Sequence, residues 1–314
     1  MTEWQYRPVA DRTIDTQYKR LIREVLDKGI RGPGVMVDKD GKEVDTIDLM
    51  GPTPSRFNLL ENGVPLLTER EIKFWKASVG ELFGFINGAR TQEELEKFGC
   101  KWWKFWATPK KCAKRGLEPG DIGPGSYGAA FTHFPTAEDP NFDAAQGVGG
   151  FDQITEIVKQ IKERPELKAH FISPWIPQYT IRNHDHQQRV VVVPCHGWMH
   201  FRVFGDKLSL VMFQRSCDIL IGCPTNWIQY SALLLAMADV LGLVPFEFVH
   251  LISDAHIYTN QLDWVDEILN RESHPFPTLK LINHHDNIKD YRPDDFMLED
   301  YTAEPAVKGI PTAI

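Results

Sequence analysis

The stretch VVVPCHGWMHF, residues 191–201, places Cys195 between a proline and a histidine at the end of an apolar run. The run predicts a buried strand, and Pro194 would interrupt its ladder by removing a backbone donor. A cysteine within a strand is usually a small buried hydrophobe. Because the polar His196 follows directly, we expect the strand to end at Cys195 and to present its thiol as a nucleophile.

A second polar group ends the strand predicted at residues 207–216. The sequence QRSCD places Arg215, Ser216 and Asp218 there, which is more polarity than a core strand can bury without partners. Arg215 could form a salt bridge with Asp218, or its planar fork could hold a phosphate. A cation close to Cys195 would also favour the thiolate. If both strand ends converge on one cleft, nucleophile, anion clamp and acid meet there.

Asn226 precedes an apolar segment at residues 227–241 that predicts a helix ended by Gly242. Thr225 or Asn226 could simply be the N-cap of this helix. Turned into a pocket, the Asn226 amide offers one donor and one acceptor, which match the ring N–H and carbonyl of uracil.

Other motifs carry less information. GPGSYG at residues 123–128 fits a glycine-rich dinucleotide pattern, but we expect neither a strand before it nor a helix after it. The histidine pairs lie in polar sequence and read as surface residues, so we assign no metal. They are His184, His186, His284 and His285.

Composition sets the class of protein. The chain has 314 residues, 42% of them hydrophobic and 25% charged, and a net charge of −8. This charge disfavours binding along nucleic acid or an anionic membrane, so a few local arginines would have to hold any phosphate. The five cysteines form no CxxC pair, which indicates reduced thiols, and neither a signal peptide nor a run of about 18 apolar residues occurs. We expect a cytoplasmic protein.

Periodicity predicts an α+β protein of one domain over residues 1–314, with Gly, Pro and aromatic residues forming an ordered loop over 106–150. Helices are expected at 16–28, 69–87, 152–164 and 227–241, strands at 170–177, 189–196, 199–204 and 207–216, a tight turn at 38–43 and a final strand pair near the C-terminus.

Five segments together resemble the thymidylate synthase family. They are PCH at 194–196, QRSCD at 214–218, GCPTNWIQYSALLLAMA at 222–238, DAHIYTNQ at 254–261, and the ending YRPDDF…KGIPTAI. The resemblance implies a large twisted mixed β-sheet flanked by helices, with one sheet face forming a homodimer interface. It also implies transfer of a one-carbon unit from 5,10-methylenetetrahydrofolate, as co-substrate and without a metal, to C5 of a pyrimidine nucleotide.

The resemblance assigns chemistry to matching residues. Cys195 resembles the nucleophile, whose thiolate adds to C6 and makes C5 nucleophilic. Glu81 matches a glutamate that organises water and relays protons, Asn226 the amide that reads uracil, and Tyr127 a tyrosine near the thiol.

Further matches concern the substrates. Asp218 resembles the carboxylate facing the folate pterin, and Ser216 occupies a nucleotide-contacting position. The remaining matches are Arg31, Arg215 and Lys168 for the phosphate, His256 and Tyr258 for the sugar hydroxyl, and Trp103, Trp106 and the C-terminal Ile314 for the folate and exocyclic carbon.

Departures from the family pattern bear on the product. Lys168 and Ala169 stand where a partner subunit usually lends two arginines, EREIKFWKAS replaces a basic segment, and GART replaces GDTN. Asn226 favours dUMP over cytosine nucleotides, and Trp103 with the TAI ending suits a site closed to water. We expect 5-hydroxymethyl-dUMP as product; the alternatives are dTMP with dihydrofolate as by-product, or a non-catalytic nucleotide- or RNA-binding descendant.

Overall fold

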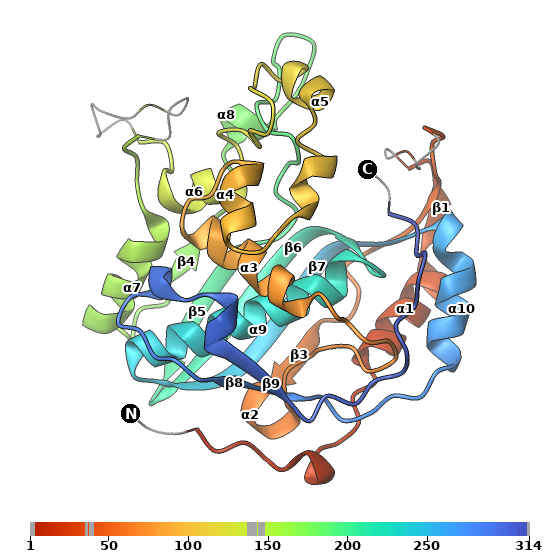
Figure 1. The fold of residues 1–314 in the computed structure, drawn as a ribbon, viewed down its shortest axis with the longest axis vertical. Helices are drawn as coiled ribbons and strands as arrows, with labels where there is room; N and C mark the ends of the chain where they lie inside the picture. The colour runs from red at the N-terminus through yellow and green to blue at the C-terminus, as the bar shows by residue number, and fades with distance from the viewer. Residues whose placement is uncertain (1–3, 35–36, 38–40, 137–142, 144–147, 313–314) are drawn as a thin grey trace.

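The computed structural model describes residues 4–34, 37, 41–136, 143 and 148–312, and its centre is a mixed β-sheet (Figure 1). Its strands are β1 (Ile30–Gly32), β2 (Thr46–Met50), β3 (Ser55–Asn58), β4 (Phe171–Ile172), β5 (Trp198–Phe204), β6 (Lys207–Asp218) and β7 (Val244–Tyr258). The order is β1-β2-β7-β6-β5-β4, with β3 also pairing β7. Only the β6–β7 pair is parallel among these pairings, so the predicted mixed sheet is confirmed.

Helices cover this sheet and frame its edges. They are α1 (Gln17–Lys28), α2 (Leu59–Asn62), α3 (Trp75–Ile86), α4 (Gln92–Lys97), α5 (Pro109–Ala113), α6 (Tyr127–Thr132), α7 (Gln153–Glu163), α8 (Pro177–Thr180), α9 (Gly222–Leu241) and α10 (Leu262–Asn270). The predicted final strand pair is β8 (Thr278–Leu281) with β9 (Phe296–Glu299).

Burial explains why the sequence forms these helices. In α1 the residues Tyr18, Leu21, Ile22 and Val25 are buried, which is the spacing of one helical face. Helix α9 is apolar on all sides because it packs between the sheet and α3. It ends at Gly242, whose φ of 66° lies in the left-handed region that glycine adopts easily. In the described part of the chain, no helix is long and apolar enough to span a bilayer.

The prediction of a strand at residues 189–196 is wrong, because this segment bonds to α8, to the loop at Ile122 and to α6 instead of to one neighbouring strand. The amide of Arg189 donates to Tyr179 O (2.9 Å), and that of Val191 donates to Ile122 O (2.9 Å). Cys195 donates its amide to the Tyr127 hydroxyl (2.7 Å). Most of the strand predicted at 170–177 is also irregular, since only the two residues of β4 pair with β5.

Two predicted helices and one predicted loop need correction. The helix expected over 69–87 begins only at Trp75, and the expected loop at 106–150 contains α5 and α6. Helix α6 follows GPGSYG directly, where none was expected. Helix α9 begins at Gly222, so Asn226 lies inside it and caps nothing. Pro224 explains the early start, because proline is tolerated in a first helical turn.

The turn predicted at residues 38–43 lies partly outside the described residues. Val37 and Glu43 form an antiparallel bridge around it, and Gly41 has a φ of 79°. The glycine therefore occupies the conformation that a tight turn requires.

Candidate functional site

Cys195 and Arg215 meet at the end of β6, although no strand carries the cysteine there. Arg215 Nη2 lies 3.3 Å from the Cys195 sulfur, and Arg215 Nε donates to Pro194 O (2.8 Å). The Arg215 backbone amide also donates to Cys195 O (2.8 Å). Within the described part of the chain Arg215 forms no ion pair, so the salt bridge to Asp218 is not made. Its charge is therefore available to an anion beside the thiol.

Two opposing effects set the protonation of Cys195. Burial raises the pKa of the thiol, and the Arg215 guanidinium lowers it by a smaller amount. The pKa of the Cys195 thiol is raised overall. Arg215 lowers it from the value that burial alone would give, so the prediction that this cation favours the thiolate is confirmed.

Tyr127 packs against the segment that contains Cys195 and His196. Its hydroxyl accepts from the Cys195 amide, and its ring stacks on His196 with centroids 4.5 Å apart and on Phe85 at 4.8 Å. His196 Nδ1 lies 2.6 Å from the Tyr230 hydroxyl. Burial, with a contribution from Arg215, lowers the pKa of His196 to about 3. The imidazole is thus too weak a base to deprotonate Cys195, and it orients the segment as a neutral ring.

Glu81 is a buried carboxylate with a complete set of donors. Its Oε1 accepts from the indole nitrogens of Trp102 (2.7 Å) and Trp103 (2.6 Å), and its Oε2 accepts from Gln229 Nε2 (2.7 Å). Burial raises the pKa of Glu81, and these hydrogen bonds oppose the rise. A carboxyl group whose pKa moves towards neutrality can both release and take up protons, which suits a proton relay.

Asn226 joins the same network. Its Nδ2 donates to Gln229 Oε1 (3.0 Å), while Gln229 Nε2 donates to Glu81 and to Ser78 O (2.9 Å). This is the one side-chain hydrogen bond that Asn226 makes to the described residues, so a second N–H and the Oδ1 acceptor remain. That donor and acceptor are the pair needed to read a uracil edge.

The ends of β6 and β7 carry a second polar cluster. Ser216 Oγ donates to Asp254 Oδ2 (3.2 Å), and His256 Nδ1 lies 3.4 Å from the same oxygen. Burial opposes protonation of His256, but Asp254 and Asp218 outweigh it, so the pKa of His256 is raised. The Tyr258 ring packs edge-on against His256 at 5.3 Å. His256 and Tyr258, the residues matched to the sugar hydroxyl, therefore lie together next to Ser216.

Asp48, Asp254 and His256 are the side chains in the described residues best placed to hold a metal, with ligand atoms within 4.8 Å of one another. One oxygen of each carboxylate already has a partner, since Thr46 donates to Asp48 Oδ2 (2.6 Å) and Asp254 Oδ2 accepts from Ser216, whereas the buried Asp254 Oδ1 has no hydrogen-bond partner among the described residues. The four surface histidines join no such group there.

Asp218 organises the turn into α9. Its Oδ1 accepts from the amides of Leu220 (2.9 Å) and Ile221 (3.1 Å), and burial raises its pKa. Gln261 Nε2 lies 3.3 Å from Asp218 Oδ2 and 3.0 Å from Pro311 O. The C-terminal tail thus runs beside Asp218, although Ile314 lies outside the described residues.

Three other predicted residues lie apart from Cys195 or at the margin of the network. Arg31 is exposed on β1 and pairs with Asp45 at 3.3 Å. Lys168 is exposed, and its backbone carbonyl accepts from His200 Nε2 (3.0 Å). Trp106 packs against Trp103 with centroids 6.1 Å apart. Neither of the two cations contacts Arg215 within this chain.

Sequence reasoning missed two residues of the Glu81 network. Gln229 is a polar residue inside an apolar helix, one turn after Asn226, and burial there demands a partner. Trp102 precedes Trp103 in a short 3₁₀ helix, Trp102–Phe105, that turns both indoles towards Glu81. The glutamine could have been found from its apolar surroundings, whereas the second indole needed the tertiary structure.

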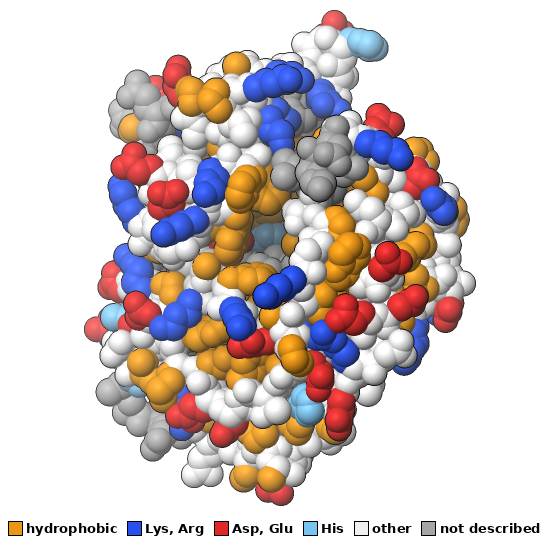
Figure 2. Space-filling view, turned by 45° about the vertical axis from the view of Figure 1, so that its right-hand side comes forward, with side chains coloured by type: hydrophobic (Ala, Val, Ile, Leu, Met, Phe, Trp, Pro, Cys, Tyr) orange, Lys and Arg blue, Asp and Glu red, His pale blue; other side chains and the backbone are white. Residues whose placement is uncertain are grey.

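The face drawn in Figure 2 is hollowed near its centre, with hydrophobic side chains at the rim and a histidine at the floor. A concave and largely apolar surface with a few polar groups is the usual setting of a small-molecule site.

The lowered pKa of His196 predicts a specific acid sensitivity. In the unfolded chain a histidine takes up a proton near pH 6.5, whereas folded His196 takes one up only near pH 3. The neutral His196 therefore contributes fully to the free energy of unfolding above about pH 6.5, and this contribution is lost as the pH falls towards 3. Between about pH 7.5 and pH 5, the wild-type protein should lose about 2 kcal/mol more of its unfolding free energy than His196→Asn. Chemical denaturation at both pH values measures this, with the exposed His184→Asn as control. Parallel losses in all three proteins would contradict it.

Comparison with known proteins identifies the family to which the chain belongs. A family model described as "Thymidylate synthase" matches residues 16–313. Similar proteins named thymidylate synthase come from equine herpesvirus 2 (33% identical, covering 93% of this chain and 96% of that protein) and varicella-zoster virus strain Dumas (33%, 97% and 96%). Another, from human herpesvirus 8 type P, is 34% identical over 94% of this chain and 83% of its own length. With the mixed sheet and helices already described, the chain belongs to the thymidylate synthase family of folate-dependent transferases.

Proposed function

We propose that this single-domain enzyme makes dTMP by transferring a one-carbon unit from 5,10-methylenetetrahydrofolate, the co-substrate of its family, to C5 of dUMP. The observation that carries the proposal is the Cys195 sulfur 3.3 Å from the Arg215 guanidinium. The sequence favoured 5-hydroxymethyl-dUMP as product. The relatives are named thymidylate synthase, which supports the alternative, dTMP with dihydrofolate as by-product.

The residues of the site suit each step of this reaction. The Cys195 thiolate adds to C6 of the pyrimidine, and C5 then attacks the one-carbon unit. Arg215 holds the nucleotide phosphate, and His256 and Tyr258 bind the sugar. Asn226 reads the base with the N–H and Oδ1 that Gln229 leaves unused. Glu81 moves protons at the ring, since burial raises its pKa.

The folate half of the reaction falls to aromatic and C-terminal residues. Trp103 and Trp106 lie together beside Glu81, and both would pack on the folate. Asp218 would face the pterin, and Ile314 would close the site against water, as reduction of the exocyclic carbon requires. The tail held at Pro311 by Gln261 supports that placement.

A homodimer would use the sheet face opposite α9. Gln214 and His250 point towards α9 through a chain of hydrogen bonds to Trp227, so the alternate residues point away. On that outer face Phe213 is 37% exposed and pairs with Trp198 of β5 and Leu251 of β7. An apolar surface of this kind on a sheet suits a second copy.

Lys168 lies at the rim of this face. Its carbonyl binds His200, which pairs with Val211 next to the outer aromatic residues. Dimerisation would therefore carry the exposed Lys168 towards the partner's Arg215, where its charge would join the phosphate site. Arg31, exposed on β1, would add a cation from the same chain. The five free cysteines support a reducing, cytoplasmic location.

Mass spectrometry and absorbance test the proposed reaction together. Protein mixed with 5-fluoro-dUMP and methylenetetrahydrofolate should gain the mass of both ligands, and Cys195→Ser should form no adduct and lose turnover by about 10³-fold or more. The matched Cys112→Ser, at a buried cysteine outside the site, should form the adduct normally.

The folate by-product identifies the product. With dUMP, one dihydrofolate per turnover is expected from its absorbance. Recovery of tetrahydrofolate with 5-hydroxymethyl-dUMP would show that the enzyme transfers a hydroxymethyl group instead of a methyl group. If 5-fluoro-dUMP forms no adduct at all, the non-catalytic alternative is supported.

Asn226→Asp should change the base that is accepted. A carboxylate loses the amide donor that matches the uracil carbonyl and gains an acceptor for the amino group of cytosine. The ratio of kcat/KM for dUMP to that for dCMP should fall by about tenfold or more. Thr225→Ser, one residue away, is the control. An unchanged ratio would remove Asn226 from base recognition.

Phe213→Glu should separate the dimer, because it places a charge at the centre of the outer sheet face. Analytical ultracentrifugation should show a dimer for the wild-type protein and monomer for the variant at equal concentration. Met297→Glu, at a residue 40% exposed on β9, should remain dimeric. A monomeric wild-type protein would contradict both the dimer and the shared role of Lys168.

A further inference from the structure

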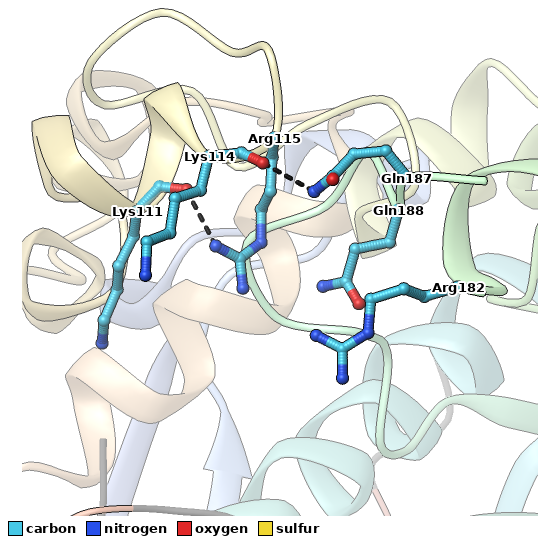
Figure 3. Close-up of a pocket in the computed structure, with 6 residues that line it drawn as sticks. All are labelled: Lys111, Lys114, Arg115, Arg182, Gln187 and Gln188. Atoms are coloured by element: carbon cyan, nitrogen blue, oxygen red, sulfur yellow. Dashed lines mark hydrogen bonds between the residues drawn. The ribbon is translucent and has the colours of Figure 1, made fainter. Parts of the chain in front are cut away.

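A basic pocket lies between α5 and the loop at residues 182–188, and none of its lining residues belongs to the site around Cys195 (Figure 3). Its volume is about 250 Å³. The lining consists of Lys111, Lys114, Arg115, Arg182, Gln187 and Gln188. It therefore contains four cationic side chains, two amides and no carboxylate.

The positive charge of this pocket is not neutralised by the protein. In the described residues, none of the four cations forms an ion pair. Burial and then the neighbouring Arg182 lower the pKa of Arg115, and burial and then Arg115 lower that of Lys111. Because the whole chain has a net charge of −8, such a concentration of cations is a local feature. Figure 2 shows Lys and Arg side chains gathered in the upper part of the molecule, where α5 lies in Figure 1.

Hydrogen bonds fix the walls of the pocket. Arg115 Nη1 donates to Lys111 O (2.8 Å) and its Nε to Val190 O (2.8 Å). Gln188 Nε2 donates to the same Val190 oxygen (3.0 Å), and Gln187 Nε2 donates to Lys114 O (2.6 Å). These bonds join α5 to the loop and leave Arg115 Nη2 without a hydrogen bond to the described residues. In Figure 3 the Arg115 and Arg182 guanidinium groups extend into the same region, next to the Gln188 amide.

We propose that this pocket binds a compact polyphosphate group, either inorganic or the phosphate chain of a nucleotide. Two arginine forks and two ammonium groups within one small cavity suit phosphates, which carry more charge per volume than carboxylates. The volume is below the roughly 300 to 1,000 Å³ of pockets that enclose a whole drug-sized ligand, so a base and sugar would remain outside. Nucleic acid fits less well, because it needs an extended track of cations and the chain is acidic. The inference does not depend on the proposed function.

Isothermal titration calorimetry of the full chain with inorganic tripolyphosphate, in magnesium-free buffer, tests the site. The wild-type protein should bind one equivalent saturably, and Arg182→Glu and Lys114→Glu should each weaken the affinity about tenfold or more. Both side chains are exposed and make no side-chain hydrogen bond to described residues, so folding should survive. Lys110→Glu makes the same charge change on α5 outside the lining and should bind within about twofold of the wild type.

Two further titrations identify the ligand and show whether it binds in this pocket. Arg215→Gln should leave tripolyphosphate binding unchanged, because the active-site cation is not in this pocket. Equal affinity for dTTP and tripolyphosphate would identify the phosphate chain alone as the ligand, and tighter dTTP binding would identify a nucleotide; each supports the site. No saturable binding, an equal loss in Lys110→Glu, loss in Arg215→Gln alone, or equal affinity for citrate would overturn the proposal.

Discussion

The contact between Arg215 and the segment ending at Cys195 is the interaction on which the site depends. That segment has no strand ladder to hold it, so its position comes from a few individual hydrogen bonds. Arg215 donates to the Pro194 carbonyl from its side chain and to the Cys195 carbonyl from its backbone amide, and its guanidinium lies against the sulfur. One residue thus positions the Cys195 thiol and keeps a positive charge beside it. Removing it would lose geometry and electrostatics together.

Burial of polar groups gives the rest of the site its order. An ionised Glu81 away from water is unfavourable unless donors surround it, and two indoles and the Gln229 amide supply them. The same glutamine fixes Asn226, so the proposed proton relay and the proposed base-reading amide share one partner. Changes at Gln229 would therefore affect both steps, because coupled networks do not respond additively.

The sheet serves two purposes through its two faces. Its inner face binds α9 by apolar packing and by the chain from Trp227 through His250 to Gln214. Its outer face keeps partly exposed aromatic residues and brings Lys168 to its rim. In the proposed dimer, Lys168 of the second subunit would add its charge to a phosphate site that already contains Arg215 of the first. The basic pocket at α5 lies apart from both faces, which is why its charge needs an explanation of its own.

Local sequence patterns predicted several of the helices and strands and the residue types of the site. Helical spacing in α1, the long apolar α9 with its terminal glycine, and the motifs around Cys195, Arg215 and Asn226 are local patterns, and local physics fixes them. The strand predicted at residues 189–196 is wrong, since an apolar run has the same composition whether it pairs with one strand or bonds to two helices and a loop. Three features follow from tertiary contacts alone: Arg215 contacts Cys195, Trp102 joins Trp103 in donating to Glu81, and burial raises the pKa of the Cys195 thiol. These depend on contacts between residues far apart in the chain and on loss of water, neither of which a local pattern records.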